Sequence, residues 1–219
     1  FQCERAVPVV STRVGSLAGL AALGAGRAHL AGCHVDNEQV ERTVAGQRCY
    51  LITLFRRTQG LIFDRNRHPE IAGLASLAGR KLRFAERQPL SGTRRLARRL
   101  LAEARIDAEG FIQVGPFSSH LELALAIRRG EADVGLGTQL AAEQCGLAFL
   151  ELQTEPFKLA VPLTFASHPR LAGFLEYVLD ELKKVASRGE SGYSFGESGR
   201  MELVGNTEAP DTRGPARGP

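Results

Sequence analysis

Apolar residues recur at helical spacing in two segments of the chain, and each segment stops at a glycine before a short apolar run. The segments are VGSLAGLAALGAGRAHLAGCH, residues 14–34, and FSSHLELALAIRRGEADVGLGTQ, residues 117–139. Each opens with a small polar turn that can cap a helix, and aligning Gly26 with Gly130 brings their apolar positions into register. This repeat predicts a two-lobed molecule. The alternative is that any α/β protein contains such helix–glycine–strand units.

The other apolar runs alternate between strand-like and helix-like patterns. Strands are expected at residues 50–63, 81–86, 110–115, 147–152 and 157–165, and helices at 71–80, 91–106 and 169–186. Strands alternating with helices predict an α/β fold with mainly parallel sheets. The expected lobes are residues 1–84 together with 163–203, and residues 85–162. The remaining segment, 204–219, is rich in glycine, proline and charge and is expected to be a disordered tail.

The composition is that of an ordinary globular protein, with 219 residues, 43% hydrophobic and 24% charged. No stretch reaches the ~18 apolar residues of a membrane span, so no membrane contact is expected. The formal net charge of +4 permits an anionic ligand or a nucleic acid as a partner without selecting either.

Cysteine and histidine spacing gives no zinc signature, because the four cysteines are scattered and none forms a CxxC pair. His29, Cys33 and His34 have suitable chemistry for a metal, but they lie on a predicted strand, where alternate side chains point to opposite faces. A packed strand end with a buried thiol is the expected structure, and neither a metal nor a cofactor is expected. Reduced cysteines favour a cytoplasmic protein.

Three small polar turns precede predicted helices and are the candidate ligand-binding residues: Gly15-Ser16, Ser91-Gly92-Thr93 and Ser118-Ser119. A helix amino terminus carries unpaired N–H groups and a partial positive charge, so it favours an anion. Arg87, just before the second turn, could add two parallel hydrogen bonds to an oxyanion. The alternative is that Ser91 only caps its helix and that Arg87 forms a surface ion pair with Glu86 or another acid.

Four arginines follow the second turn, and their spacing forms two columns on one helix: Arg94, Arg95, Arg98 and Arg99. A solvated face or a contact between subunits is expected there, with contact to DNA as the alternative. No GxSxG, P-loop, GxGxxG or HExxH motif occurs in the chain. A nucleophile–base pair of Ser91 or Ser118 with His120 is unfavourable at a helix start, so no enzymatic activity is expected.

Several segments together resemble the type II periplasmic-binding-protein fold: residues 14–23, 28–34, 57–62, 87–94, 130–137 and 192–200. The similar branch is the ligand-binding domain found behind winged-helix DNA-binding domains or fused to molybdopterin-biosynthesis proteins. The resemblance implies two lobes with a ligand cleft between them, where the three turns would meet. The spacing of Arg87 from Ser91-Gly92-Thr93 also resembles the anion clamp of phosphate-binding receptors.

The resemblance further implies a domain that senses a small anion, such as molybdate, tungstate or a related metabolite, for a bacterial transcription regulator. DNA would then be contacted only through an attached domain, and a homodimer is possible. The first strand and helix of the family are expected to be missing before residue 5. The alternative is a solute-binding receptor of an ABC transporter.

Overall fold

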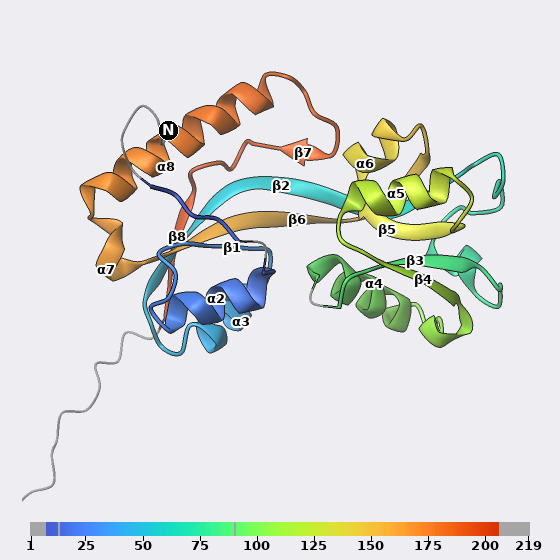
Figure 1. The fold of residues 1–219 in the computed structure, drawn as a ribbon, viewed down its shortest axis with the longest axis horizontal. Helices are drawn as coiled ribbons and strands as arrows, with labels where there is room; N and C mark the ends of the chain where they lie inside the picture. The colour runs from blue at the N-terminus through green and yellow to red at the C-terminus, as the bar shows by residue number, and fades with distance from the viewer. Residues whose placement is uncertain (1–7, 13, 90, 206–219) are drawn as a thin grey trace, which may run out of the picture.

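Two long antiparallel strands connect the two lobes of the molecule (Figure 1). The computed structural model describes residues 8–12, 14–89 and 91–205. Strands β2 (Cys49–Phe63) and β6 (Ala148–Pro162) pair along their whole length, with register shifts between Thr53 and Phe55 and between Gln59 and Gly60. Such irregularities locally bend and twist a ribbon. We propose that the regular stretch between them, residues 55–59, is the crossing segment, where the ribbon passes from one lobe to the other.

All described strands belong to one mixed sheet with the order β1-β6-β2-β5-β3-β4, and β7 and β8 also pair with β2. The remaining strands are β1 (Ala31–Cys33), β3 (Arg83–Arg87), β4 (Ile112–Phe117), β5 (Val134–Thr138), β7 (Tyr193–Ser194) and β8 (Met201–Val204). The predicted α/β class is confirmed, but the strand directions differ from the expectation of mainly parallel sheets. Only β3 pairs in parallel, with β4 and β5, whereas every described pair that includes β2 or β6 is antiparallel. The reason is that these two strands run in opposite directions through both lobes.

Lobe 1 packs helices around the outer halves of β2 and β6. Its helices are α2 (Ser16–Gly24), α3 (Asn37–Thr43), α7 (Leu163–Ala166) and α8 (Pro169–Ala186). Leu20 and Leu23 of α2 are fully buried against Cys33 of β1 and Leu51 of β2. Helix α3, which begins at the cap residue Asp36, was not predicted, because its sequence NEQVERT contains a single apolar residue.

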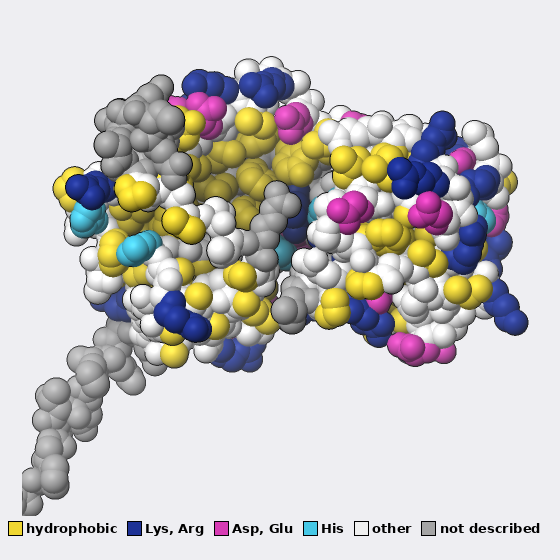
Figure 2. All heavy atoms as spheres, in the orientation of Figure 1, with side chains coloured by type: hydrophobic (Ala, Val, Ile, Leu, Met, Phe, Trp, Pro, Cys, Tyr) yellow, Lys and Arg dark blue, Asp and Glu magenta, His cyan; other side chains and the backbone are white. Residues whose placement is uncertain are grey.

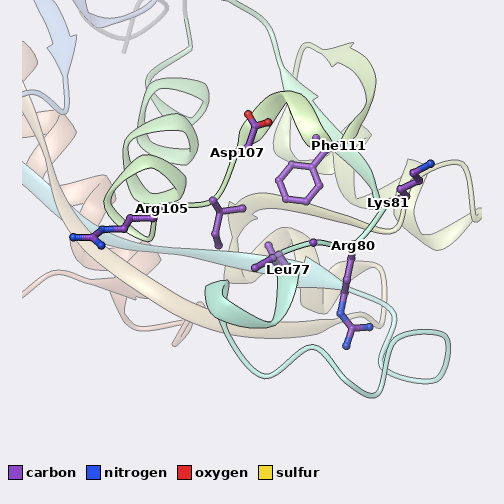
Figure 3. A pocket seen from close by; sticks show the side chains of 10 residues that line it. Leu77, Arg80, Lys81, Arg105, Asp107 and Phe111 are labelled. Carbon is purple, nitrogen blue, oxygen red and sulfur yellow. The ribbon is translucent and has the colours of Figure 1, made fainter.

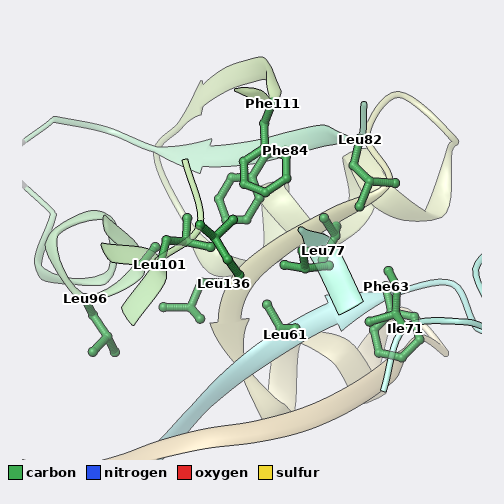
Figure 4. Close-up of a cluster of buried hydrophobic side chains, with 13 residues drawn as sticks. Leu61, Phe63, Ile71, Leu77, Leu82, Phe84, Leu96, Leu101, Phe111 and Leu136 are labelled. Atoms are coloured by element: carbon green, nitrogen blue, oxygen red, sulfur yellow. The ribbon is translucent and has the colours of Figure 1, made fainter. Parts of the chain in front are cut away.

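Lobe 2 holds the largest buried cluster, which Figure 4 shows around Leu61, Phe84 and Leu136. Its helices are α4 (Gly92–Glu103), α5 (His120–Arg128) and α6 (Gln139–Gln144), with 3₁₀ turns at Leu74–Leu77 and Ala108–Gly110. Leu96 and Leu101 of α4 pack into this cluster, and Leu123 and Ile127 of α5 pack on the other side of the sheet. The two faces of the lobe 2 strands are therefore both covered.

The predicted repeat is visible as two matching units, one in each lobe. Helices α2 and α5 have nine residues each, and both end before a glycine in the left-handed region, Gly26 at φ 68° and Gly130 at φ 77°. Each unit then enters a strand, β1 or β5. The repeat thus places one helix start in each lobe. Both starts lie toward the segment of the β2–β6 ribbon that connects the lobes.

The predicted lobe boundaries at 84/85 and 162/163 stay predictions. Residues 61–84 pack with α4 and β5 in the largest cluster, so we propose that the chain crosses within β2 and returns within β6. Two strands predicted for residues 147–165 are one strand, β6, in the structure. Of the predicted tail, Val204 is buried in β8 and Gly205 donates to Glu41, while residues 206–219 lie outside the described residues. Within the described part of the chain, no helix is long and apolar enough to cross a membrane.

Candidate functional site

The polar centre of the molecule begins on the crossing segment of β2 and β6. Arg57 and Glu155 are cross-strand partners, and the Arg57 Nε and Nη2 atoms donate to Glu155 Oε1 at 2.8 and 2.6 Å. Gln59 Nε2 donates to the same oxygen at 2.6 Å. Glu155 and Gln59 are buried, with 7% and 0% of their surfaces exposed. The ribbon that joins the lobes therefore carries a buried, charged row.

Arg87 at the end of β3 brings a second guanidinium to this centre from lobe 2. Its Nε donates to the Phe117 carbonyl at 3.2 Å and its Nη2 to the Ser118 carbonyl at 2.9 Å, while the buried Nη1 has no hydrogen-bond partner. The alternative of a surface ion pair with Glu86 is wrong, because Arg87 is only 9% exposed. Burial, and then the charge of Arg57, lower the pKa of the Arg87 guanidinium.

His120, the first residue of α5, lies over the end of β5 beside Arg87. Its Nδ1 atom is buried without a hydrogen-bond partner and lies 3.5 Å from the position that a Cβ would take at Gly137. Burial holds the pKa of His120 well below its ordinary value of 6.5, and Arg87, Arg57 and His34 lower it further. The imidazole is therefore neutral, so it contributes hydrogen-bonding capacity without charge.

His34, just after β1, connects lobe 1 to the start of α4. Its Nδ1 lies 3.0 Å from Ser16 Oγ, and its backbone N–H donates to the same oxygen at 3.4 Å. A Cβ at Gly92 would lie 1.6 Å from His34 Nε2, so the ring is seated directly on the backbone of Gly92. Burial lowers the pKa of His34 below 6.5. Only glycine at position 92 allows this contact between the lobes.

The polar side chains of this centre share one feature: each of several has a buried atom without a hydrogen-bond partner. Among the described residues five buried side-chain atoms lack a hydrogen-bond partner, and four of them belong to this site: His34 Nε2, Gln59 Oε1, Arg87 Nη1 and His120 Nδ1. Buried polar groups in folded proteins are nearly always paired with protein or water. Four such atoms around two guanidiniums therefore mark the candidate site for a polar ligand.

The structure brings some of the predicted turns to this site. Ser16 contacts His34, and Gly15 is the residue before α2, with φ 81°. Gly92 contacts His34, and Ser91 accepts a hydrogen bond from the Arg94 N–H at 3.1 Å as the cap of α4. Thr93 is buried at 3% exposure.

The turn before α5 is already occupied by a carboxylate. Ser118 Oγ donates to both carboxylate oxygens of Glu122, at 2.8 and 2.7 Å, and Ser119 Oγ accepts from the Glu122 N–H at 3.0 Å. The Ser118 carbonyl instead holds Arg87. Ser118 thus positions Arg87 through its carbonyl, and direct ligand binding by Ser118 or Ser119 stays a prediction.

The arginines of α4 point outward and are mostly paired with acids. Arg94 and Arg98 both contact Glu86, at 2.6 and 2.8 Å, and Arg99 contacts Glu103 at 2.9 Å. Neighbouring carboxylates therefore offset most of the positive charge on this face of α4. Arg95 is exposed and its charge contributes to lowering the pKa of His34.

Sequence reasoning missed five residues of the site: His34, Arg57, Gln59, His120 and Glu155. The usable signal was the polar run at residues 56–59 inside the strand predicted at 50–63, because charged residues in such a strand are buried only when they are paired. Glu155 lies between the strands predicted at 147–152 and 157–165, so no comparable pattern marked it. Cys33 is buried, as predicted for a packed strand end. Within the described ranges, no group of three His, Cys, Asp or Glu side chains could hold a metal ion.

A separate pocket lies at the far end of lobe 2, between the turn at Leu77 and the loop around Asp107 (Figure 3). Leu77, Ile106 and Phe111 form its apolar lining. Arg80, Lys81 and Arg105 extend away from it in Figure 3, and Arg80 contacts Glu70 at 3.0 Å. This pocket has no converging polar groups, so the inter-lobe centre is the better candidate site.

Comparison with known proteins agrees with this geometry. The uncharacterised protein YvgK of Bacillus subtilis (strain 168) is 27% identical over 123 residues, which make up 56% of this chain and only 40% of that protein. The regulatory domain of CcmR from Synechocystis PCC6803, in complex with 2-PG, superimposes with a TM-score of 0.63 at 17% identity, covering 83% of this chain and 86% of that one. A tungstate ABC transporter structure from Geobacter sulfurreducens gives 0.56 at 17% identity, covering 80% of this chain and 83% of that one.

At these identities the structural likenesses show the fold. The family is shown by a sequence model of the PBP superfamily domain, which matches residues 2–179 and so includes all the residues of the polar centre described above. The chain therefore belongs to the periplasmic-binding-protein (PBP) superfamily.

Proposed function

We propose that this chain is the ligand-sensing domain of a bacterial transcription regulator, and that its two lobes close on a small anion. The anion is an oxyanion such as molybdate or tungstate, or a related metabolite. The observation that carries the proposal is the group of four unpartnered polar atoms around Arg57 and Arg87. Each buried unsatisfied group costs about 1–3 kcal/mol, so a ligand that supplies their hydrogen bonds stabilises the closed form.

The charges of the site favour an anion of low charge. Arg57 and Arg87 contribute two positive charges, and Glu155 cancels one of them through its hydrogen bonds to Arg57. His34 and His120 have lowered pKa values and are neutral near pH 7. One net positive charge therefore remains among these side chains, so a monoanion neutralises them fully, whereas a dianion such as molybdate also draws on the partial positive charge of the helix amino termini.

Gln59 offers the ligand a hydrogen-bond acceptor. Its Nε2 atom is fixed by the Glu155 carboxylate, so the unpartnered Oε1 atom is an acceptor that faces the site. A flipped amide would place its oxygen against that carboxylate. A ligand that carries a hydroxyl, an amino group or an acidic proton next to its charge would satisfy this acceptor.

Two roles for such a domain are supported by different neighbours. The CcmR regulatory domain, with 2-PG bound, supports a sensing role in a regulator. The tungstate ABC transporter structure supports the second candidate, a solute-binding receptor. The full coding sequence distinguishes them, because a helix-turn-helix segment before this domain favours the regulator and an export signal favours the receptor.

Binding rather than catalysis is the better function for this arrangement. Ser16 and His34 are within 3.0 Å, but His34 Nε2 has no acidic partner to orient the ring, as a nucleophile–base pair requires. The Ser118 hydroxyl donates to Glu122, and the Ser91 hydroxyl accepts from the Arg94 N–H as the cap of α4. Neither hydroxyl therefore contacts a histidine.

The experiment is a thermal-shift screen with molybdate, tungstate, sulfate, phosphate and small carboxylates, followed by calorimetric titration. A ligand at one hundred times its Kd stabilises the protein by about 2.7 kcal/mol, which corresponds to several degrees in a chain of this size. Arg87→Gln should weaken the binding by at least about 1.5 kcal/mol, the low end for a hydrogen bond to a charged group.

Arg98→Gln is the matched control, because Arg98 lies on the exposed face of α4 and pairs with Glu86 and Glu109. We expect it to leave the affinity unchanged. Equal losses in the two variants, or no response to any anion in the screen, would contradict the proposed function.

A further inference from the structure

Four partly exposed aromatic rings lie next to the charged row on the crossing segment. Phe55 and Phe157 are cross-strand partners whose rings stack, with centroids 5.0 Å apart and planes 4° apart. Tyr193 meets Phe55 edge-on at 5.4 Å, and Phe195 lies at 6.2 Å from Phe55. All four side chains are only partly buried. They form what we call the aromatic wall: Phe55, Phe157, Tyr193 and Phe195.

The aromatic wall is not part of the hydrophobic core. None of its members belongs to the four buried clusters or packs against them as a partly buried neighbour. The chain has only 11 Phe and 3 Tyr, so four rings in one place are a substantial share of its aromatic residues. Rings that are neither buried in a core nor scattered singly on the surface are typical of a binding surface.

The aromatic wall and the charged row share one face of the ribbon. Arg57 pairs with Glu155 on one side and with Tyr193 on the other, and directly paired residues project to the same face. The Arg57 guanidinium carbon lies 5.9 Å from the centre of the Phe157 ring. His34 is stacked on Phe157 at 6.3 Å and 21°. Arg57, His34 and the rings therefore border one space.

Figure 2 shows this arrangement at the surface. A hollowed apolar area lies over the β2–β6 ribbon below α8, and Lys or Arg and His side chains are visible at its edge beside lobe 2. The Phe157 ring lies against Gly32 of β1, where a Cβ would be 2.9 Å from its Cζ atom. Glycine at position 32 therefore leaves room for the ring to lie flat.

We infer that the ligand is a monoanion carried on a flat apolar ring, that is, an aromatic carboxylate rather than a bare inorganic oxyanion. The inference rests on the proposed function and names the ligand class of that same site. The carboxylate lies between Arg87 and Arg57, and the ring lies on the aromatic wall. A tetrahedral oxyanion would satisfy the donors but would leave the exposed parts of the rings in contact with water.

The test compares benzoate, cyclohexanecarboxylate, acetate and molybdate by calorimetric titration of the whole chain. We expect benzoate to bind at least about tenfold more tightly than acetate, because its ring removes apolar surface from water. Cyclohexanecarboxylate, which has a similar apolar area but no flat face, should bind more weakly than benzoate.

Phe157→Leu keeps an apolar side chain but removes the flat ring, and it should abolish most of the preference for benzoate over acetate. Phe165→Leu is the matched control, since Phe165 is exposed in α7 and has ring contacts with His29 and His168 outside the site. Melting temperatures of both variants establish that they fold.

The outcomes separate the two proposals. If acetate and benzoate bind equally, or if molybdate binds and benzoate does not, the ring proposal is overturned and the anion site remains. If benzoate keeps its preference in Phe157→Leu and in a second variant, Phe55→Leu, the aromatic wall is not the ring site. If no anion binds at all, the proposed function fails.

Discussion

At the scale of single residues, the unusual feature is a pair of neutral histidines beside two guanidiniums. Positive neighbours and burial both disfavour a protonated imidazole, and for His120 the causes in order are burial, Arg87, Arg57 and His34. For His34 they are burial and the charges of Arg57 and Arg95, with Glu155 acting in the opposite direction. The folded protein therefore resists protonation of two residues that the unfolded chain protonates freely.

This difference predicts a stability loss in mild acid. Because the folded pKa values lie below 6.5, the contribution of both histidines is complete above pH 6.5 and is lost as the pH falls through their folded pKa values. The free energy of unfolding should fall by up to about 1.4 kcal/mol per pH unit for each histidine. Urea unfolding at pH 7.5 and 5.5 measures this loss.

His120→Gln, which cannot be protonated, should roughly halve the loss. His29→Gln is the control, because His29 is exposed and lies outside the site. An unchanged pH dependence in His120→Gln would show that this histidine is not buried in the neutral form.

The residues that sequence reasoning identified are those whose role is local. Ser91 could be recognised as a helix cap because its partner, the Arg94 N–H, is three residues away. Arg57, Glu155 and His34 are brought together only by strand pairing across about a hundred residues and by a contact between lobes. No local pattern specifies such neighbours, so the charged centre could not be assembled from the sequence.

At the scale of elements, the lobes also touch where His34, just after β1, meets Gly92 of α4. His34 follows β1, and its Nδ1 atom is hydrogen-bonded to Ser16 of α2. Its ring packs against Gly92, the first residue of α4. The same α4 start was predicted to bind the ligand. Because the ring occupies the place of a side chain at position 92, the two lobes approach at the amino ends of α2 and α4.

A substitution at this contact should therefore change the stability in the direction opposite to the one that helix propensity predicts. Alanine is a better helix former than glycine, yet its Cβ at position 92 would overlap His34 Nε2. We expect Gly92→Ala to destabilise the protein by about 1–3 kcal/mol, as overpacking does in a well-packed interior. Thermal and urea unfolding measure the change.

A double-mutant cycle tests whether the overlap with His34 causes the destabilisation by Gly92→Ala. In a His34→Ala background, Gly92→Ala should lose most of its destabilising effect. Gly173→Ala in α8 is the matched control, because a Cβ there meets nothing within 4 Å, and we expect it to stabilise by about 0.5–1 kcal/mol. Additive effects of the two substitutions would contradict a direct contact.

The elements themselves were largely predictable where a period or a cap recurs. The repeat identified α2 and α5 together with their left-handed glycines, and Ser91 and His168-Pro169 marked the starts of α4 and α8. The strand directions were not predictable in this way. Strands 50–63 and 147–165 were recognised as β-rich, but only their pairing with each other shows that they run antiparallel and cross both lobes.

At the scale of the whole molecule, the charges of the centre oppose closure when no ligand is present. Arg57 comes from the crossing ribbon and Arg87 from lobe 2, and the charge of Arg57 lowers the pKa of Arg87. Glu155 offsets the charge of Arg57 from within the buried centre, and Glu122 offsets part of the charge of Arg87. An anion between the guanidiniums removes this repulsion, so it binds the closed form better than the open form.

We therefore expect an anion to reduce the radius of gyration of the protein, measured by small-angle X-ray scattering. The anion used is the one among molybdate, sulfate and benzoate that gives the largest thermal shift. A tenfold higher affinity for the closed form shifts the open–closed equilibrium by about 1.4 kcal/mol. Arg87→Gln removes one of the two charges, so the ligand-free variant should already be more compact than the parent, whereas Arg98→Gln on the outer face of α4 should not be. A radius that stays constant while the melting temperature rises would mean that the anion binds without closing the lobes, and the sensing mechanism would then need another moving part.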